Sequence, residues 1–301
     1  MAYRFGSRES VQSAVRRVAR EQIDRAVARI DSGDRHRAVH LVRRHGKRLR
    51  ALLRLVEPVF PEAADEYAQL RAIARPLSAV RDARVAVATA GRLRERCDAL
   101  DRSALLPALQ AALQAYCEAL ARGVDGAPGI DALMASARAQ LLAQRERVTG
   151  WSLSADGFEA VGEGFARSYR RARRAMRAAL DGGDAGQWHR WRRRGKVHAC
   201  QLELLRPLWP ALLEARAGEL RRLNARLGEH HDLAQLPLWF AALPGAAAPA
   251  ELDPCARART QALERDCRPL GMRLYADRPR DLVRDLRRWW NLWGQSAPHD
   301  A

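Results

Sequence analysis

The segment HRAVHLVRRHGKRLRALLRLVE, residues 36–57, decides the fold class, because its polar and apolar residues follow the period of an α-helix. On a helical wheel at about 100° per residue, its basic side chains fall within an arc of roughly 80°. This arc contains His40, Arg43, Lys47, Arg50 and Arg54, with Arg44 and Ala51 beside it. The opposite side carries Leu41, Val42, Leu49, Leu52, Leu53 and Val56. The segment therefore predicts a helix that buries one face and presents a row of cations on the other.

The same pattern occurs a second time from Trp188 onward, at an offset of 149 positions. The matched pairs include His40 with His189, Arg43 with Arg192, Arg44 with Arg193, Gly46 with Gly195, Lys47 with Lys196, and Pro58 with Pro207. After one inserted residue the pairs continue with Leu70 and Leu220, Arg71 and Arg221, Leu77 and Leu227, and Asp82 and Asp232. Chance would align both lysines about one time in 300, so we interpret the match as an internal duplication. It predicts two helical halves, residues 5–148 and 152–296, related by a pseudo-two-fold axis.

The remaining segments have the same helical character. Ala, Leu and Arg, which are good helix formers, repeat with helical period through nearly every long segment. Breaks are expected at residues 31–34, 57–58, 123–129, 149–156, 181–186, 206–207, 243–254 and 277–279. About ten amphipathic helices lie between these breaks, and no alternating strand pattern is present. We therefore expect an all-α protein made of helical bundles with mostly short connections.

Composition narrows the classes of partner. The 301 residues include 53 Lys+Arg against 35 Asp+Glu, a formal net charge of +18, and 48% are hydrophobic. The apolar content excludes a mainly disordered chain, and the absence of a run of about 20 apolar residues excludes a membrane span. We expect Trp289, Trp290 and Trp293 to dock on the helical bundle and not on a membrane surface, so we expect no membrane partner. The positive excess predicts a polyanionic partner, which could be nucleic acid, an anionic membrane surface or a phosphate polymer. Only two of the 53 basic residues are lysine, Lys47 and Lys196, and both lie in the duplicated basic rows.

The cysteines bear on the compartment. Cys97, Cys117, Cys200, Cys255 and Cys267 are odd in number and lack CxxC spacing. This pattern predicts free thiols in a reducing compartment, instead of a disulfide framework or a zinc site. The first ten residues have no apolar stretch of the kind found in secretory signals. We therefore expect a cytoplasmic protein.

Two further rows of arginine are present. Residues 165–177 place Arg170, Arg174 and Arg177 on one predicted helix face, with Arg167 at its edge. The N-terminal Arg16, Arg17, Arg20 and Arg25 form a weaker counterpart. Rows from both halves are expected to line one central basic groove or pore. Uncompensated like charges at helical spacing cost a few tenths of a kcal/mol per pair, so we favour an anion-binding face over an inert surface.

Two aspartates and the histidines are the remaining candidates for chemistry. Asp82 and Asp232 follow Arg81 and His231 at equivalent positions, where each could orient an arginine or cap a helix. Neither has a second carboxylate at a spacing suited to acid–base catalysis. The histidines lack HExxH spacing and two of them lie among cations, so we expect no metal ion and no cofactor. No P-loop, GxSxG or Cys/His nucleophile pattern is present, and we expect no enzymatic activity.

Several segments together resemble the CHAD family, the conserved histidine α-helical domain. They are Val39-His40-Leu41-Val42-Arg43, Lys47-Arg48-Leu49-Arg50-Ala51, Arg81-Asp82-Ala83-Arg84-Val85, Tyr169-Arg170-Arg171-Ala172-Arg173, His189-Arg190-Trp191-Arg192 with Lys196 and Glu203, and Leu227-Gly228-Glu229-His230-His231-Asp232. They span nearly the whole chain in the family's order. The resemblance implies a single CHAD domain over residues 5–296, with two pseudo-symmetric four-helix halves around a central basic groove. The chain departs from the family at Arg44, where an apolar residue is expected, and at Ala199-Cys200, where Arg-Tyr is common.

The resemblance also implies a function. CHAD proteins bind inorganic polyphosphate and can localise to polyphosphate granules, and this chain resembles a stand-alone member without the ExExK signature of a triphosphate tunnel metalloenzyme domain. The residues expected to bind polyphosphate are His40, Arg43, Arg44, Lys47, Arg48, Arg50, Arg54, Arg81, Arg170, Arg174, His189, Arg192, Arg193 and Lys196. Sequence-nonspecific binding of nucleic acid is the alternative, although no groove-reading element or stacking platform is evident. A polyphosphate-processing enzyme would need metal-binding carboxylates, which do not cluster here.

Overall fold

The computed structural model describes residues 3–32, 34–101, 105–123, 128–241 and 250–295. In these residues the chain forms helices and no strand, which confirms the all-α prediction. The first half contains α1 (Val11–Asp31), α2 (Arg35–Val56), η1 (Glu57–Val59), α3 (Ala63–Ala74), α4 (Ser78–Arg94), α5 (Asp98–Asp101), α6 (Leu105–Arg122), α7 (Ile130–Arg147) and η2 (Val148–Gly150). The second half contains α8 (Gly157–Leu180), α9 (Ala185–Leu205), η3 (Arg206–Leu208), α10 (Pro210–Ala241), α11 (Leu252–Leu274) and α12 (Pro279–Gln295). None of these helices has the length and apolar content to cross a membrane.

The helix boundaries follow most of the predicted breaks, with three differences. One is an unpredicted break after Arg94, where α4 ends before the short α5. Residues 63–94 form two helices, because Pro76 has no N–H for a helical hydrogen bond and the chain turns there between α3 and α4. Pro254 was expected in a break, but it lies in the first turn of α11, where a missing N–H costs nothing. Residues 242–249 of that break lie outside the described residues. The described part holds twelve α-helices, including the four-residue α5, where about ten were expected.

The two halves share an order of elements. α1 and α2 are followed by η1, and α8 and α9 by η3, each 3₁₀ helix with a proline near its start, Pro58 or Pro207. Asp34 caps α2 and Asp184 caps α9, and each side chain accepts a hydrogen bond from a backbone N–H in the first turn. α10 then runs without a break, where the first half has α3 and α4. This order supports the duplication, which stays a prediction together with its pseudo-two-fold axis.

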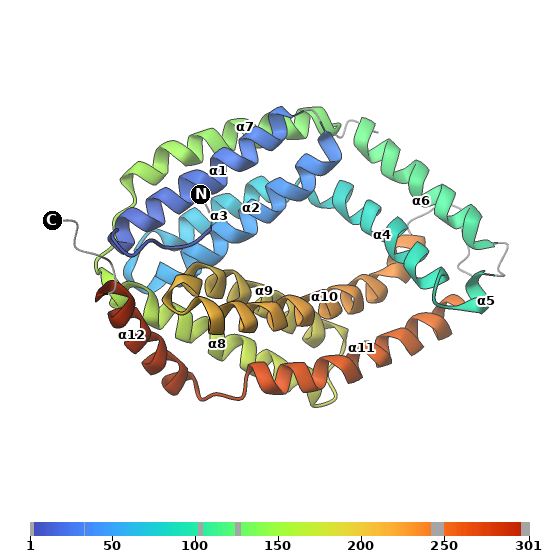
Figure 1. Ribbon diagram of the computed structural model, residues 1–301. Helices are drawn as coiled ribbons and strands as arrows, with labels where there is room; N and C mark the ends of the chain where they lie inside the picture. The colour runs from blue at the N-terminus through green and yellow to red at the C-terminus, as the bar shows by residue number, and fades with distance from the viewer. Residues whose placement is uncertain (1–2, 33, 102–104, 124–127, 242–249, 296–301) are drawn as a thin grey trace.

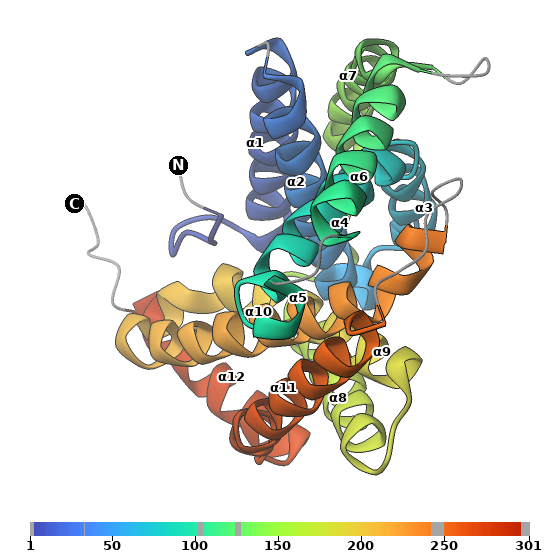
Figure 2. The same ribbon diagram turned by 90° about the vertical axis from the view of Figure 1, so that its right-hand side faces the viewer.

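The halves meet where α2 packs against α8 and α9. In Figure 1 the helices of the first half lie in the upper part and those of the second half in the lower part, and Figure 2 shows the same division from the side. α8 approaches α2 closely at Gly164, where a Cβ would lie 1.8 Å from the carbonyl oxygen of Leu55. One hydrophobic core spans the contact, with Leu52, Phe165 and Trp191 among its fully buried side chains.

A second, smaller core lies between α4, α6, α10 and α11, on the right-hand side of Figure 1. Its buried side chains include Ala86, Leu113, Leu236 and Leu263. Here the C-terminal part of α10 packs against α4, so the halves contact each other at both ends of the molecule. Through these contacts α4 lies between α10 and α6, and it also contacts α2 and α5.

A disulfide joins Cys97, which precedes α5, to Cys255 of α11, with Cα atoms 6.2 Å apart. The prediction that all five cysteines are free thiols was therefore wrong for this pair, although Cys117, Cys200 and Cys267 are free. The two partners are 158 residues apart and meet only through the second core, so their local spacing carried no signal. The pairing removes the support that the cysteines gave to a reducing compartment.

Candidate functional site

The two faces of α2 lie as the sequence predicts. Its apolar side is buried, with Val42, Leu49, Leu52, Leu53 and Val56 each at most 3% exposed. On the basic side His40 and Arg44 are exposed, whereas Arg43, Lys47 and Arg50 are partly buried. The middle of the basic row is therefore covered by other elements and is not a fully solvated surface.

Those elements are α3 and α9, which form a pocket of about 230 Å³ with α2. Lys47 and Arg50 line it from α2, and the other basic lining residues are Arg71 of α3 and Arg192, Arg193 and Lys196 of α9. The basic rows of the two halves therefore meet at one pocket. We call the eight cations at the pocket and its rim the central cluster: Arg43, Lys47, Arg50, Arg71, Arg81, Arg192, Arg193 and Lys196.

The two lysines respond strongly to this environment. Burial, followed by the charges of Arg43 and Arg81, lowers the pKa of Lys47 to about 8. Burial, followed by the charges of Arg192 and Lys47, lowers the pKa of Lys196 to about 7, against a smaller opposing effect of Asp232. No hydrogen bond or ion pair to either ammonium group is present among the described residues. Each ammonium group is therefore destabilised by its surroundings.

Two carboxylates face the central cluster. The Nη1 of Arg81 donates to the Oδ1 of Asp82 at 2.8 Å. Burial raises the pKa of Asp232, and the charges of Arg192 and Arg81 oppose this rise. The Oδ1 of Asp232 and the Nε of Arg192 are buried without a hydrogen-bond partner in the described part of the chain. Both aspartates lie inside helices, α4 and α10, so neither caps a helix, and Asp82 orients Arg81 instead.

Arg43 holds α4 against the pocket. Its Nη1 donates to the carbonyl oxygen of Ala74 at 2.8 Å and to the Oγ of Ser78 at 2.7 Å. These two groups end α3 and begin α4, so one guanidinium group fixes the turn between them. Arg43 is thereby a structural residue for α4 as well as a cation beside Lys47.

Three histidines lie at one end of the central cluster. The Nδ1 atoms of His189 and His231 are 3.0 Å apart, so one ring donates and the other accepts. Burial, followed by the charge of Arg192, lowers the pKa of both, to about 3 for His231. Burial, followed by the charge of Lys47, also lowers the pKa of His40. These side chains are therefore neutral near pH 7 and contribute hydrogen bonds more than charge.

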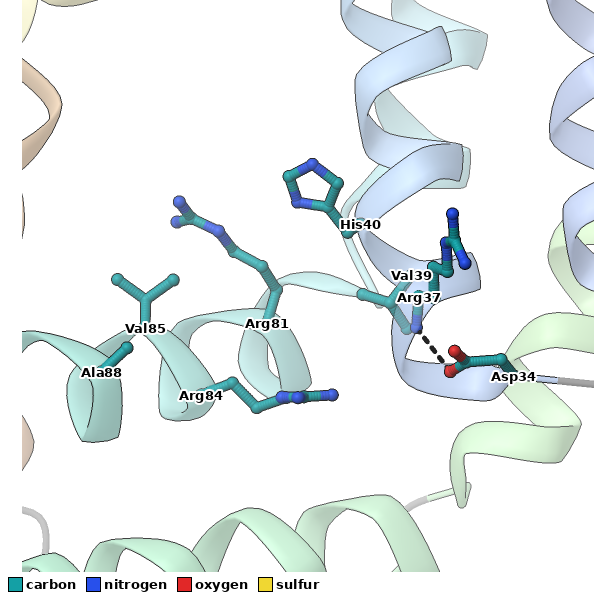
Figure 3. A pocket seen from close by; sticks show the side chains of 8 residues that line it. All are labelled: Asp34, Arg37, Val39, His40, Arg81, Arg84, Val85 and Ala88. Carbon is teal, nitrogen blue, oxygen red and sulfur yellow. Dashed lines mark hydrogen bonds between the residues drawn. The ribbon is translucent and has the colours of Figure 1, made fainter. Parts of the chain in front are cut away.

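A second pocket, of about 590 Å³, lies between the start of α2 and α4. His40 and Arg81 line it together with Arg37 and Arg84, and Figure 3 shows His40 and Arg81 extending toward the same space. The charge of Arg81 lowers the pKa of both His40, which lines this second pocket, and Lys47, which lines the first. Arg81 therefore links the two pockets.

Arg48 and Arg54 of α2 are engaged with other groups. The Nη2 of Arg48 donates to the Oε1 of Glu203 at 2.6 Å, and its guanidinium group lies 4.7 Å from the ring centre of Tyr3. This ion pair joins α2 to α9, and neither residue lines the pocket. The Nη1 of Arg54 donates to both carboxylate oxygens of Glu57 at 3.0 Å, at the edge of the central cluster.

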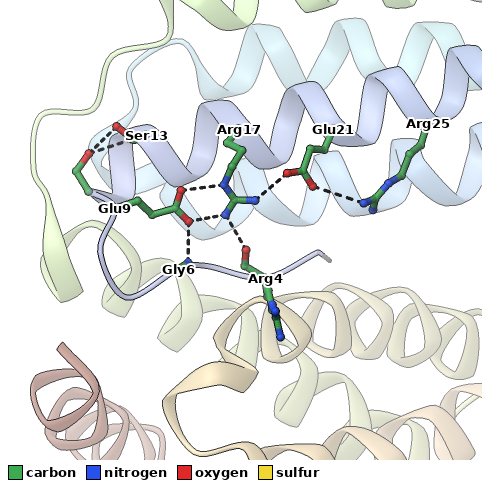
Figure 4. A network of polar contacts seen from close by, with 8 residues as sticks. Arg4, Gly6, Glu9, Ser13, Arg17, Glu21 and Arg25 are labelled. Carbon is green, nitrogen blue, oxygen red and sulfur yellow. Dashed lines mark hydrogen bonds and ion pairs between the residues drawn. The ribbon is translucent and has the colours of Figure 1, made fainter. Parts of the chain in front are cut away.

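The arginines of α8 and α1 lie outside the central cluster. The Nη2 of Arg170 donates to the Oε1 of Glu163 at 2.8 Å, and Arg174 is exposed on the same helix. In α1, Arg17 pairs with Glu9 and with Glu21, as Figure 4 shows. Of the four basic rows predicted to line one groove, the structure brings two together, those of α2 and α9.

Sequence reasoning missed other residues of the site. Tyr67 and Arg71 of α3 line the first pocket, and Arg37 and Arg84 line the second. Arg71 carried a signal, since it matches Arg221 in the repeat. The others depend on how α3 and α4 fold back on α2, and no spacing along the chain reveals that. No group of three or more side chains able to hold a metal ion occurs among the described residues, and the absence of a metal or cofactor stays a prediction.

Comparison with known protein families finds a match for this chain. The family model of the CHAD domain matches residues 14–241, which include every element that lines the two pockets. No curated protein and no solved structure matches the chain. The family match covers most of the 301-residue chain. The chain therefore belongs to the CHAD family.

Proposed function

We propose that this CHAD protein binds inorganic polyphosphate at the central cluster and does not catalyse its turnover. CHAD is a family associated with polyphosphate. One observation carries the proposal: two lysines and six arginines from α2, α3, α4 and α9 converge at one pocket, and two carboxylates face them. Such an excess of positive charge is unfavourable unless an anion compensates it.

The side chains suit a chain of phosphates. A planar guanidinium group presents a fork of donors to two oxygens of one phosphate, whereas an ammonium group is a compact charge on a flexible stem. Binding releases counterions from the polyanion, so we expect the affinity to fall steeply as salt is added. No group in this scheme reads a base or distinguishes one phosphate from the next.

Nucleic-acid binding is the second candidate, and the shape of the site disfavours it. A duplex is read by an element that projects into one of its grooves, whereas the cations here line a pocket of about 230 Å³. Single strands are held by bases stacked on aromatic rings. Tyr67 lines this pocket, but the guanidinium groups of Arg50 and Arg54 lie 5.9 and 4.4 Å from its ring centre. A phosphate chain without bases fits this arrangement better.

A polyphosphate-processing enzyme is disfavoured by the carboxylates themselves. Asp82 accepts a hydrogen bond from Arg81, and Asp232 faces Arg192. Both carboxylates therefore lie beside arginine, in a setting with an excess of positive charge, which makes them poor ligands for a catalytic cation. The proposal includes a cytoplasmic location and association with polyphosphate granules. A fluorescent fusion is expected to coincide with granules in cells, and a diffuse signal would contradict that part.

A competition experiment tests the proposed ligand. Labelled long-chain polyphosphate is bound at about 0.15 M salt and displaced by unlabelled polyphosphate, duplex DNA or single-stranded RNA at equal phosphate concentration. We expect polyphosphate to displace the label at concentrations at least about tenfold lower than either nucleic acid. Equal displacement by DNA or RNA would favour the nucleic-acid function, and absence of polyphosphate binding would contradict the proposal.

A further inference from the structure

The chain uses lysine at only two positions, and both side chains line the same pocket. Lys47 extends from α2 and Lys196 from α9, and both are partly buried. Arginine stays charged at any pH at which proteins fold, because its pKa is above about 12. A lysine in a buried and positively charged setting can instead lose its proton. At this pocket the two lysines can therefore lose their charge by deprotonation, whereas the arginines around them cannot.

Around the two ammonium groups, positively charged side chains outnumber negatively charged ones. Six arginines face the ammonium groups: Arg43 and Arg50 of α2, Arg71 of α3, Arg81 of α4, and Arg192 and Arg193 of α9. The opposing carboxylates are Asp82 of α4 and Asp232 of α10. His40, His189 and His231 lie at one end, and Tyr67 and Cys200 complete the lining. Burial and the excess of arginine both favour a neutral amine on each lysine.

We propose that the pocket binds its phosphate chain together with protons, which Lys47 and Lys196 take up as the anion enters. This inference rests on the function proposed above and adds its regulation by pH. Phosphate oxygens compensate the surrounding arginines and accept hydrogen bonds from the ammonium groups, so they favour the charged lysines. By linkage, the affinity then rises as the pH falls.

The size of the effect follows from the pKa values without the anion, about 7 for Lys196 and about 8 for Lys47. A bound anion that returns both groups to an ordinary value of about 10.4 causes uptake of about one proton per site near pH 7.5. Under the same assumption the affinity falls about 20-fold between about pH 6 and about pH 8.

Other groups at the site titrate outside this window. The pKa values of His40, His189 and His231 are lowered, so an entering anion changes their protonation mainly below about pH 7. In a long polyphosphate, only the two chain ends titrate near neutral pH. Measurements with long chains above about pH 7 therefore report on the lysines.

Calorimetric titration of the unmodified protein with long-chain polyphosphate tests the inference. The titration is run near pH 7.5, at constant ionic strength, in Tris and in HEPES, whose heats of ionisation differ. We expect a difference in binding heat that corresponds to uptake of about one proton per site. Equal heats in the two buffers overturn the inference and leave polyphosphate binding intact. Absence of binding in both buffers overturns the proposed function, and this inference with it.

Variants identify the side chains that take up the protons. Lys47→Arg with Lys196→Arg keeps both charges and removes the titration, so its affinity should change less than about twofold between pH 7 and 8.5. The matched control His231→Gln replaces a neutral side chain and should retain the uptake of the unmodified protein. Proton uptake that persists in the arginine variant would overturn the inference. If circular dichroism shows that the double variant is unfolded, the two single variants test the inference instead. We expect Lys196→Arg to lose more of the proton uptake than Lys47→Arg.

Discussion

Lys47 of α2 and Lys196 of α9, 149 positions apart in the sequence, line one pocket, and the charge of Lys47 is among the causes that lower the pKa of Lys196. The two ammonium groups therefore share one environment. Each basic row on its own would be a strip of cations on one helix. Packed together, with Arg81 of α4 beside them, the rows form a concave site with a large excess of positive charge.

The two lysines should destabilise the protein when no anion is bound. Their pKa values are lower in the folded state than in the unfolded state, so folding disfavours the charged form. This penalty is fully present below about pH 7 and disappears as the pH rises toward 10.5. We expect Lys47→Met with Lys196→Met to raise the free energy of unfolding by about 2 kcal/mol near pH 6 and by less near pH 9.

Urea denaturation at several pH values measures this difference. Arg280→Met, on the exposed face of α12, is the control and should change the free energy of unfolding by less than about 0.5 kcal/mol. A methionine variant that is less stable than the unmodified protein near pH 6 would show that the ammonium groups have favourable partners in the folded state.

Arg48 should support the fold more than it supports binding. Its ion pair with Glu203 is partly buried, with the arginine side chain 14% exposed, and it joins α2 to α9 through two residues that do not line the pocket. We expect Arg48→Ala to lower the free energy of unfolding by about 1–3 kcal/mol, because Glu203 loses its partner. The affinity for polyphosphate should change less than about threefold.

The matched variant Glu203→Gln breaks the same ion pair from the other side. A similar loss of stability in both variants, measured by thermal unfolding, would confirm that the contact is structural. A tenfold or greater loss of affinity in Arg48→Ala at unchanged stability would instead make Arg48 a binding residue, as its position in the motif first suggested.

The contact between α8 and α2 depends on Gly164. A Cβ at this position would lie 1.8 Å from the carbonyl oxygen of Leu55, which is backbone and cannot rotate away. We expect Gly164→Ala to separate the helices and to lower the free energy of unfolding by more than about 3 kcal/mol.

Gly46 is the matched control for this substitution. It lies inside α2, and a Cβ there would meet nothing within 4 Å. Alanine has the higher helix propensity, so Gly46→Ala should raise the free energy of unfolding by about 0.5–1 kcal/mol. Equal effects of the two substitutions in chemical denaturation would contradict the close approach of α8 to α2.

The sequence predicts the fold class and the centre of the candidate site for a physical reason. Helical periodicity assigns each side chain of α2 to a face, and burial of the apolar face then directs Lys47 and Arg50 away from the core. The second row, with Arg192 and Lys196, follows from the same pattern in α9. The alignment of the two lysines indicated that the rows are equivalent, and the structure places them at one pocket.

Other parts of the site were not predictable, because a helical wheel gives only the direction of a side chain from its own helix. Arg48 points toward Glu203, and Arg170 toward Glu163, and these partners decide what each arginine does. Tyr67 reaches the pocket because the chain turns back after η1. Arg43 donates a hydrogen bond to Ser78 because the chain turns a second time at Pro76. These contacts depend on tertiary packing, which local periodicity does not specify.

The central claim is that the central cluster binds polyphosphate, and charge reversal at its two lysines tests this most directly. In Lys47→Glu with Lys196→Glu, the new carboxylates lie beside Arg43, Arg81 and Arg192, where they can form ion pairs, so the variant should fold. Arg280→Glu with Arg288→Glu, on α12, changes the net charge equally and is the control.

The measurement is the affinity of each folded variant for long-chain polyphosphate at about 0.15 M salt. The account predicts a loss of at least about 100-fold for the lysine variant and of less than about threefold for the control. Equal affinities in the two variants would contradict it, because net charge and not the pocket between α2, α3 and α9 would then determine binding.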